Sequence, residues 1–210
     1  MKTLKVKITF IEELLGSSAA NPDIHAEYIA SNAPDAPSRE EEIATIGVEK
    51  YIENAMTVFP RNADGQPIIW DYQIRGFFKA ACGFLRKVSD SKSKNLKAFK
   101  KEIDGLVHVK PRMIPIQFEG EISSCQRPLR AETAQGARVA LANSESIPAG
   151  ATAEFEVIML NDDDEKLVRE WLDYGQWNGL GQWRNSGKGS YLWEELNDKG
   201  EVIGGNLKAK

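Results

Sequence analysis

The stretch 71–87 reads DYQIRGFFKAACGFLRK, and it decides the fold because strand-like segments lie on both sides of it. Its apolar residues recur every three or four positions, as they do on a helix with one buried side. They are Tyr72, Ile74, Phe77, Phe78, Ala81 and Leu85. Asp71 stands directly before them and is a suitable N-terminal cap. The pattern therefore predicts a buried helix from Asp71 to Lys87.

Alternating apolar and polar residues predict strands before and after this helix. Residues 4–10 and 153–160 alternate in this way, as half-buried strands do. Asp64-Gly65 lies between two apolar runs and predicts a hairpin that joins 57–59 to 67–70. Shorter apolar runs predict further strands. They lie at 106–109, 113–116, 138–141 and 190–195.

A second helix is expected over 162–174. The run Asn161–Glu165 places acidic groups at its start, where they complement the positive end of the helix dipole. We prefer this explanation of the acidic run to a metal site. The apolar residues that follow have helical spacing. They are Leu167, Val168, Trp171 and Leu172.

The order of these elements predicts the architecture. Strand, helix, strands, strand, helix, strand is the order of a ferredoxin-like fold, so we expect an α+β protein. Residues 1–210 would form a single domain, with a long insertion over 17–70 after the first strand. Long loops inside compact domains are usually functional or mobile. Residues 198–210 are polar and are expected to form a frayed, mobile tail.

The composition excludes several classes of protein. The chain has 210 residues, of which 41% are hydrophobic, enough for a buried core. Two cysteines exclude a disulfide framework and a multi-cysteine zinc site. No apolar run is long enough to span a membrane, and the N-terminus lacks the apolar block of a secretory signal. We therefore expect a cytoplasmic protein with no membrane partner and no cofactor.

Positive charge is concentrated in one part of an acidic chain. The whole chain has a net charge of −4, yet residues 84–112 hold nine basic residues against three acidic ones. Such asymmetry is typical of an edge that faces a polyanion. Lys97, Lys100 and Lys101 are the candidates for phosphate contacts. The alternative is a solvated lysine-rich loop.

The segment 175–189, GQWNGLGQWRNSGKG, separates the second predicted helix from the last predicted strand. Its glycines let the backbone approach a ligand closely and expose amides to phosphates. Trp177 and Trp183 could stack on bases, and Arg184 and Lys188 could hold phosphates. The segment is not a Walker loop, because no Ser or Thr follows Lys188. The alternative is a tight connection with core tryptophans.

Two of these segments resemble the RAMP superfamily, the ferredoxin-like RNA-binding subunits of CRISPR effector complexes. Residues 71–79, DYQIRGFFK, stand at the place of the family's helix signature, which is typically IPGSSLKGALR. Residues 179–189, GLGQWRNSGKG, match the family's Gly-rich loop in place and texture. The resemblance covers the core framework but not 17–70. It implies a RAMP-like or RRM-like ferredoxin fold that binds RNA.

The resemblance also implies RNA contacts for six residues. They are Gln73, Arg75, Lys79, Arg184, Ser186 and Lys188. The chain departs from the family where Tyr72-Gln73 replaces a small Gly-Ser pair, which puts the backbone contact there in question. Arg75 and Lys79 are four residues apart and share one side of a helix. The alternative for these two residues is an exposed helix face.

Residues 127–138 carry three arginines in a segment that we expect to be an extended loop. Arg127, Arg130 and Arg138 could pair with phosphates or reach another copy of the chain, and RAMP backbone subunits use a hairpin-like projection in this manner. The alternative is a surface loop with local salt bridges. The run 127–133, RPLRAET, and the Gly-rich loop also resemble an uncharacterised phage family from Gram-positive hosts. That resemblance implies a viral gene and no particular activity.

Catalysis has little support in the sequence. Asp23, His25 and Asp35 lie in polar segments after the first strand, where such residues are commonly caps or turn residues. We therefore expect a phage-encoded, non-catalytic protein that binds RNA or single-stranded DNA and could bind copies of itself. The alternatives are a phage assembly or interaction protein that binds no nucleic acid, and a metal-dependent nuclease.

Overall fold

The computed structural model describes residues 1–19, 56–133 and 136–207. Contacts group the chain into two compact units. Unit 1 comprises Met1–Leu14, Pro60–Glu121 and Ile147–Lys210, and unit 2 comprises Leu15–Phe59 and Ile122–Ser146. Part of the predicted insertion, from Pro60 onward, thus belongs to unit 1, whereas the segment after Glu121 belongs to unit 2. That both units fold as the single domain expected for 1–210 stays a prediction.

Unit 1 is built on a seven-stranded antiparallel sheet. At its centre, β1 (Lys2–Phe10) lies between β10 (Thr152–Met159) and β11 (Tyr191–Leu196). β12 (Val202–Gly205) extends the sheet beyond β11. The segment expected to be a frayed tail therefore contains a strand that is hydrogen-bonded to the sheet.

On its other side, β10 pairs with two successive strands. They are β6 (Val107–Lys110) and β7 (Met113–Gln117), and β7 pairs in turn with β5 (Ile68–Trp70). The central order β11-β1-β10-β6 is that of the ferredoxin-like fold. The predicted α+β fold class is therefore confirmed.

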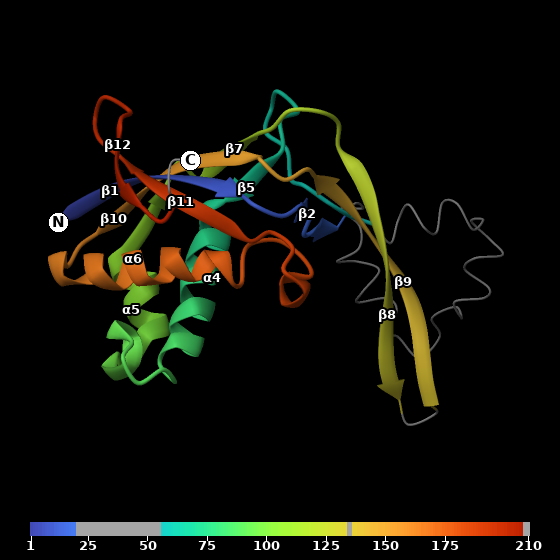
Figure 1. Ribbon diagram of the computed structural model, residues 1–210, viewed down its shortest axis with the longest axis horizontal. Helices are drawn as coiled ribbons and strands as arrows, with labels where there is room; N and C mark the ends of the chain where they lie inside the picture. Colours follow the sequence, from blue (N-terminus) through green and yellow to red (C-terminus); the bar gives the residue numbers. More distant parts are fainter. Residues whose placement is uncertain (20–55, 134–135, 208–210) are drawn as a thin grey trace. The chain divides into compact units, whose positions relative to one another are not determined.

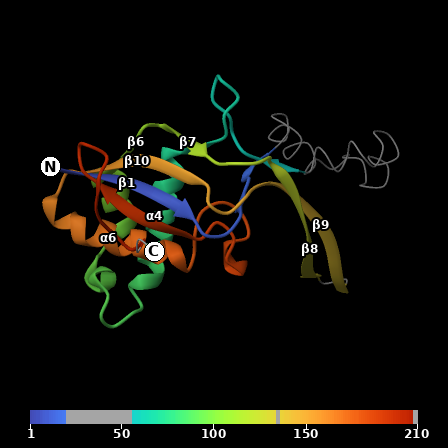
Figure 2. The ribbon, with the colours of Figure 1, turned by 45° about the horizontal axis from the view of Figure 1, so that its top comes forward.

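The two predicted helices cover one face of this sheet (Figures 1 and 2). They are α4 (Asp71–Leu85) and α6 (Glu165–Asp173). The rings of Phe78 in α4 and Trp171 in α6 lie 5.6 Å apart, so the helices pack against each other. A third helix, α5 (Phe99–Leu106), contacts α4 and leads into β6.

Alternation along β1 directs its apolar side chains into the core beneath the sheet. Leu4, Val6, Ile8 and Phe10 are all buried. At the start of β11, the Tyr191 ring packs against Phe10 at 6.2 Å and against Phe77 of α4 at 5.5 Å. The core extends as far as the first residue of the Gly-rich segment. A Cβ on Gly175 would lie 2.3 Å from the Tyr191 ring, so the ring packs directly against the backbone there.

The start of α4 differs from the prediction. Trp70, not Asp71, is the N-cap, and the helix begins at Asp71. The Asp71 carboxylate instead pairs with Arg75, one turn along the helix, at 3.3 Å. The Gln73 side chain accepts a hydrogen bond from the Trp70 backbone N–H at 2.8 Å. One helical N–H that would otherwise lack a partner is thereby satisfied.

The turn predicted around Asp64-Gly65 forms and closes a short antiparallel hairpin. Gly65 has a φ of +78° and donates a backbone hydrogen bond to the Asn62 carbonyl at 3.0 Å. Arg61 pairs with Pro67, and the Ile68 N–H donates to the Pro60 carbonyl at 2.9 Å. Beyond this pairing the strands have other partners: β5 pairs with β7, and β4 (Thr57–Val58) pairs with β3 (Ser18–Ala19). The local signal therefore identified the turn and the short hairpin but not these further partners.

Unit 2 contains two long antiparallel strands, β8 (Ser123–Thr133) and β9 (Gly136–Ile147). The predicted strand at 138–141 is part of β9, and the expected arginine-bearing loop at 127–138 is a β-hairpin. β9 also pairs with β2 (Leu14–Leu15) and, in parallel, with β4. The Thr57 and Ser144 hydroxyl oxygens lie 2.7 Å apart at that parallel pairing.

A single carboxylate holds the segment between α4 and α5 against α6. Glu170 of α6 accepts hydrogen bonds from the Ser91 hydroxyl (3.0 Å), the Lys92 backbone N–H (2.7 Å) and the Ser93 hydroxyl (2.6 Å). The Ser93 hydroxyl also accepts from the Trp171 indole at 3.0 Å. Burial alone would raise the pKa of Glu170, but these hydrogen bonds outweigh it and lower the pKa.

We expect the substitution Glu170→Gln to destabilise the protein at pH 7 by about 1–3 kcal/mol, because an amide places donors against the donors of 91–93. A lowered pKa means that the ionised Glu170 stabilises the fold at neutral pH and stops doing so as the pH falls. The difference in unfolding free energy between wild type and variant should therefore shrink below about pH 4.3, the ordinary glutamate pKa. Urea titrations from pH 7 to pH 3 measure it.

The control is Glu119→Gln, because Glu119 is exposed and belongs to no such network. It should leave the unfolding free energy unchanged at every pH. A Glu170→Gln variant as stable as wild type at pH 7 would show that the network does not hold the segment.

Candidate nucleic-acid interface

The Gly-rich segment folds back on itself through one close backbone contact. Leu180 donates a backbone hydrogen bond to the Gly189 carbonyl at 3.0 Å. A Cβ on Gly179 would lie 1.7 Å from that same carbonyl oxygen, so residue 179 cannot carry a side chain. Gly189 itself has a φ of +70°, in the left-handed region that glycine adopts readily.

Two residues predicted to contact RNA instead bind groups of the protein itself, one just after β1 and one within the loop. Lys188 forms an ion pair with the Glu13 carboxylate at 2.8 Å, and the Gly189 N–H donates to the Glu13 carbonyl at 2.7 Å. The Ser186 hydroxyl donates to the Trp183 carbonyl at 3.0 Å. These contacts fix the loop, and they engage Lys188 and Ser186 with the protein itself.

A groove of about 340 Å³ lies between α4 and this loop. Ala80 and Phe84 of α4 form one wall, and Trp183 and Arg184 form part of the other. Three side-chain amides line it as well. They belong to Asn178, Gln182 and Asn185. An aromatic face, a guanidinium and amides are the groups that stack on bases, pair with phosphates and bind base edges.

Phe84 was missed by the sequence analysis. It is 52% exposed, and its ring stacks against Tyr174 with the centroids 6.2 Å apart and an interplanar angle of 24°. Phe84 lies seven residues after Phe77, about 20° from it around the helix and at the margin of the buried stripe of α4. Helical spacing alone therefore gave no sign that Phe84 is exposed.

The two tryptophans of the loop are not buried core residues. Trp177 is 72% exposed, and Trp183 is half-buried. Trp183 has a φ of 56°, a left-handed conformation that costs a non-glycine residue about 1–3 kcal/mol and is concentrated at functional sites. Trp177 is therefore not a core residue, whereas Trp183 is partly covered by the protein.

The three predicted lysines lie at the surface close to the C-terminal end of α4. Lys97, Lys100 and Lys101 are exposed, and within the described residues none of them forms an ion pair. The guanidinium of Arg86, at the end of α4, lies 5.2 Å from the centroid of the Phe99 ring in α5. The basic segment therefore begins two residues after Phe84, at the edge of the groove.

Arg75 and Lys79 lie on the side of α4 that faces away from the groove. Lys79 forms an ion pair with Asp104 of α5. At about 100° per residue, Lys79 is on nearly the opposite side of the helix from Phe84. The Arg75 guanidinium pairs with Asp71. The structure therefore does not bring these two predicted residues together with Trp183 and Arg184.

The three arginines of the predicted loop belong to unit 2. Arg127 is 6% exposed, and one of its guanidinium nitrogens lies 3.4 Å from the Ser144 hydroxyl. It is therefore a buried residue and not the surface residue that the sequence suggested. Arg130 and Arg138 lie in β8 and β9, where the register pairs them with Val139 and Ala131.

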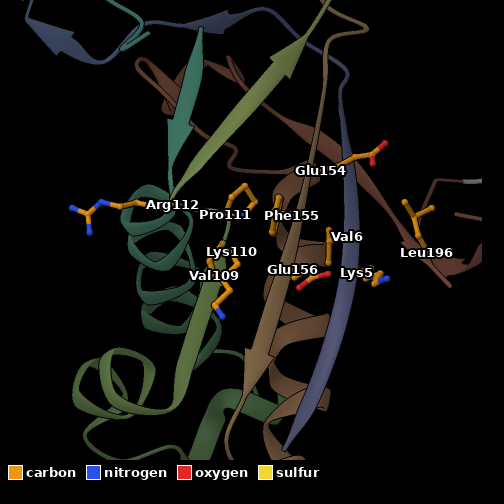
Figure 3. A pocket seen from close by; sticks show the side chains of 10 residues that line it. All are labelled: Lys5, Val6, Val109, Lys110, Pro111, Arg112, Glu154, Phe155, Glu156 and Leu196. Carbon is orange, nitrogen blue, oxygen red and sulfur yellow. The ribbon is translucent and has the colours of Figure 1, made fainter. Parts of the chain in front are cut away.

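A larger cavity, of about 690 Å³, lies on the sheet face opposite the helices (Figure 3). Its basic side chains are Lys5, Lys110 and Arg112, and its acidic side chains are Glu154 and Glu156. The strand register places Glu156 beside both Lys5 and Lys110. Because neighbouring charges on this face offset one another, we place the candidate interface at the groove.

The described residues contain no cluster of His, Cys, Asp or Glu that could hold a metal ion. In the acidic run, the Asn161 side chain accepts a hydrogen bond from the Asp163 backbone N–H, as a helix-capping residue does. Asp23, His25 and Asp35, considered for cleavage, lie outside the described residues. No described helix is both long and apolar enough to cross a membrane.

No protein-family model and no curated protein matches the chain. Among solved structures, it is similar to a chain in the cryo-EM structure of the type III-B Cmr-beta complex bound to cognate target RNA. The TM-score is 0.50 at 13% sequence identity, over 93% of this chain and 60% of the other. This chain therefore spans less than two thirds of the matched chain. At this identity the similarity shows a shared fold.

We expect Gly179→Ala to destabilise the protein by about 3 kcal/mol, because the new methyl group would overlap the Gly189 carbonyl. Thermal and urea unfolding measure the change. The matched control is Gly76→Ala in α4, where a Cβ meets nothing within 4 Å. That control should stabilise the protein by about 0.8–1 kcal/mol, because alanine favours a helix over glycine. Equal stability of both variants would contradict the close contact.

Proposed function

We propose that this protein binds single-stranded nucleic acid, RNA before DNA, through the groove between α4 and the Gly-rich loop. The observation that carries the proposal is that Phe84, Trp183 and Arg184 line one groove. The proposed activity is binding without cleavage, because these residues are groups that stack on bases and pair with phosphates.

The chemistry of the groove suits an unpaired base more than a duplex. Aromatic side chains stack on the faces of bases, which a duplex keeps covered. Trp183 presents its ring from a strained backbone position, and Arg184 follows it directly. Three amide side chains in the same groove can both donate to and accept from a base edge.

The basic segment beside the groove suits a phosphate backbone. Arg86 and Lys87 follow Phe84 along the chain, and Lys97, Lys100 and Lys101 are exposed beyond them. A strand whose base occupies the groove would thus find positive charge next to it. The fold agrees with this function, because the similar Cmr-beta chain comes from a complex that was solved with its target RNA.

We expect Trp183→Ala to weaken the binding of a single-stranded oligonucleotide by about 1–3 kcal/mol, the usual contribution of one stacked base. Fluorescence anisotropy with labelled RNA and DNA of the same sequence measures it. Trp183→Phe, which keeps an aromatic ring at the same backbone position, is the control and should retain most of the affinity.

The melting temperature separates this role from a packing role. Loss of affinity in Trp183→Ala with an unchanged melting temperature supports stacking. A truncation that instead costs about 3–5 kcal/mol of folding free energy, as a core truncation does, would assign Trp183 to packing.

A second expectation concerns salt. The double variant Lys100→Glu, Lys101→Glu should lower the slope of log affinity against log salt by about 1.4, because each phosphate contact to a single strand contributes about 0.7. The matched control is Lys166→Glu, Lys199→Glu, which reverses two exposed lysines elsewhere in unit 1. Affinities measured at several salt concentrations provide both slopes.

Two results would count against this part of the proposal. Equal slopes in the two double variants would leave Lys100 and Lys101 as solvated surface. A wild-type protein with no affinity for RNA or single-stranded DNA would favour the rival function, an assembly or interaction protein of the same fold.

A further inference from the structure

A second group of stacked aromatic and basic side chains lies at the other end of α4. The rings of Trp70, the last residue of β5, and Tyr72 lie 6.2 Å apart with an interplanar angle of only 13°. The guanidinium of Arg112 lies 5.9 Å from the centroid of the Trp70 ring. We call these three residues the stack.

The strand pairing builds this arrangement. Trp70 pairs with Met113 across β5 and β7, which places Arg112 beside it. The Asp71 backbone N–H donates to the Arg112 carbonyl at 3.0 Å, so the first residue of α4 is tied to the same point. The stack therefore stands on a sheet edge and a helix start, both of which are regular structure.

The stack is exposed and basic. Tyr72 is 53% exposed although one side of its ring rests on Trp70. Arg112 is exposed too, and no acidic group among the described residues forms an ion pair with it. In Figure 3 the Arg112 side chain extends away from Phe155 and Lys5. An exposed aromatic ring with an unneutralised guanidinium beside it matches a base and its phosphate.

We infer that the stack is a second binding station for the same single strand, on which a further base stacks against Tyr72 while Arg112 contacts a phosphate. The inference rests on the proposed function, because the first station is the groove beside Phe84. Tyr72 and Phe84 are twelve residues apart on one helix, a separation of about 18 Å along its axis and about 120° around it, so a strand that meets both stations passes round the helix. A short oligonucleotide would then reach one station, and a longer one would reach both.

The experiment compares two probes, a uridine dinucleotide and a uridine homopolymer of about 12 nucleotides, within the range that one small domain contacts. Titration calorimetry measures the affinity of the full chain for each probe. Tyr72→Ala should weaken the long probe by about 5- to 150-fold and leave the dinucleotide unchanged. Tyr72→Phe keeps the ring and should bind both probes as wild type does.

Arg112→Gln tests the second half of the stack. It should weaken the long probe and reduce the salt dependence of its binding, because one phosphate contact is lost. Tyr72 and Arg112 are both exposed, so the melting temperatures of these variants should equal that of the wild type.

The outcomes separate this inference from the proposed function. If wild type binds neither probe, both fail. If Trp183→Ala weakens both probes while Tyr72→Ala and Arg112→Gln weaken neither, the groove stands and the second station is overturned. Equal weakening of both probes by Tyr72→Ala would also overturn it, because a separate station cannot affect a probe that does not reach it.

Discussion

The candidate interface depends on the contact between the backbones of Gly179 and Gly189. The contact leaves no room for a side chain at residue 179, and it closes the loop that carries Trp183 and Arg184. The same turn of chain is tied to the segment directly after β1 through the carbonyl of Glu13. Because β1 is the central strand of the sheet, this contact fixes the position of the loop relative to the sheet. A groove that forms between such a loop and α4 is present before any ligand arrives.

Much of the fold could be predicted from periodicity. The alternation in β1 and β10 and the three- and four-residue spacing in α4 and α6 report which side of an element is buried, and burial is a local consequence of the sequence. Partner choice is not local. The turn at Asn62–Gly65 and a short antiparallel pairing beside it form as predicted, yet β5 and β4 also pair with β7 and β3, whose sequences lie elsewhere in the chain. For the same reason β12, four residues within a polar C-terminal segment, was not recognised as a strand.

The residues of the candidate site likewise fall into those that a local sequence pattern predicts and those that depend on distant neighbours. Trp183 and Arg184 were found because glycines around a tryptophan and a cation form an unusual local pattern. Arg75, Lys79 and Arg127 were candidates by charge and by resemblance, but their positions are decided by neighbours that the sequence does not reveal: Asp71, Asp104 and Ser144. Phe84 was missed because its spacing from Phe77 is that of a buried residue, and the stack of Trp70, Tyr72 and Arg112 was missed because it is assembled from separate elements.

The Glu170 network affects how much entropy the protein would lose on binding a nucleic-acid strand. Its carboxylate gathers hydroxyl and backbone donors from residues 91–93, in the way that a bound anion would order a flexible loop. The Glu170 carboxylate thus orders residues 91–93 at the start of the lysine-rich segment. The backbone that leads to the lysines before α5 therefore already has a defined conformation. A polyanion that docks there would not have to freeze this part of the backbone, so less of the attraction would be offset by lost conformational entropy.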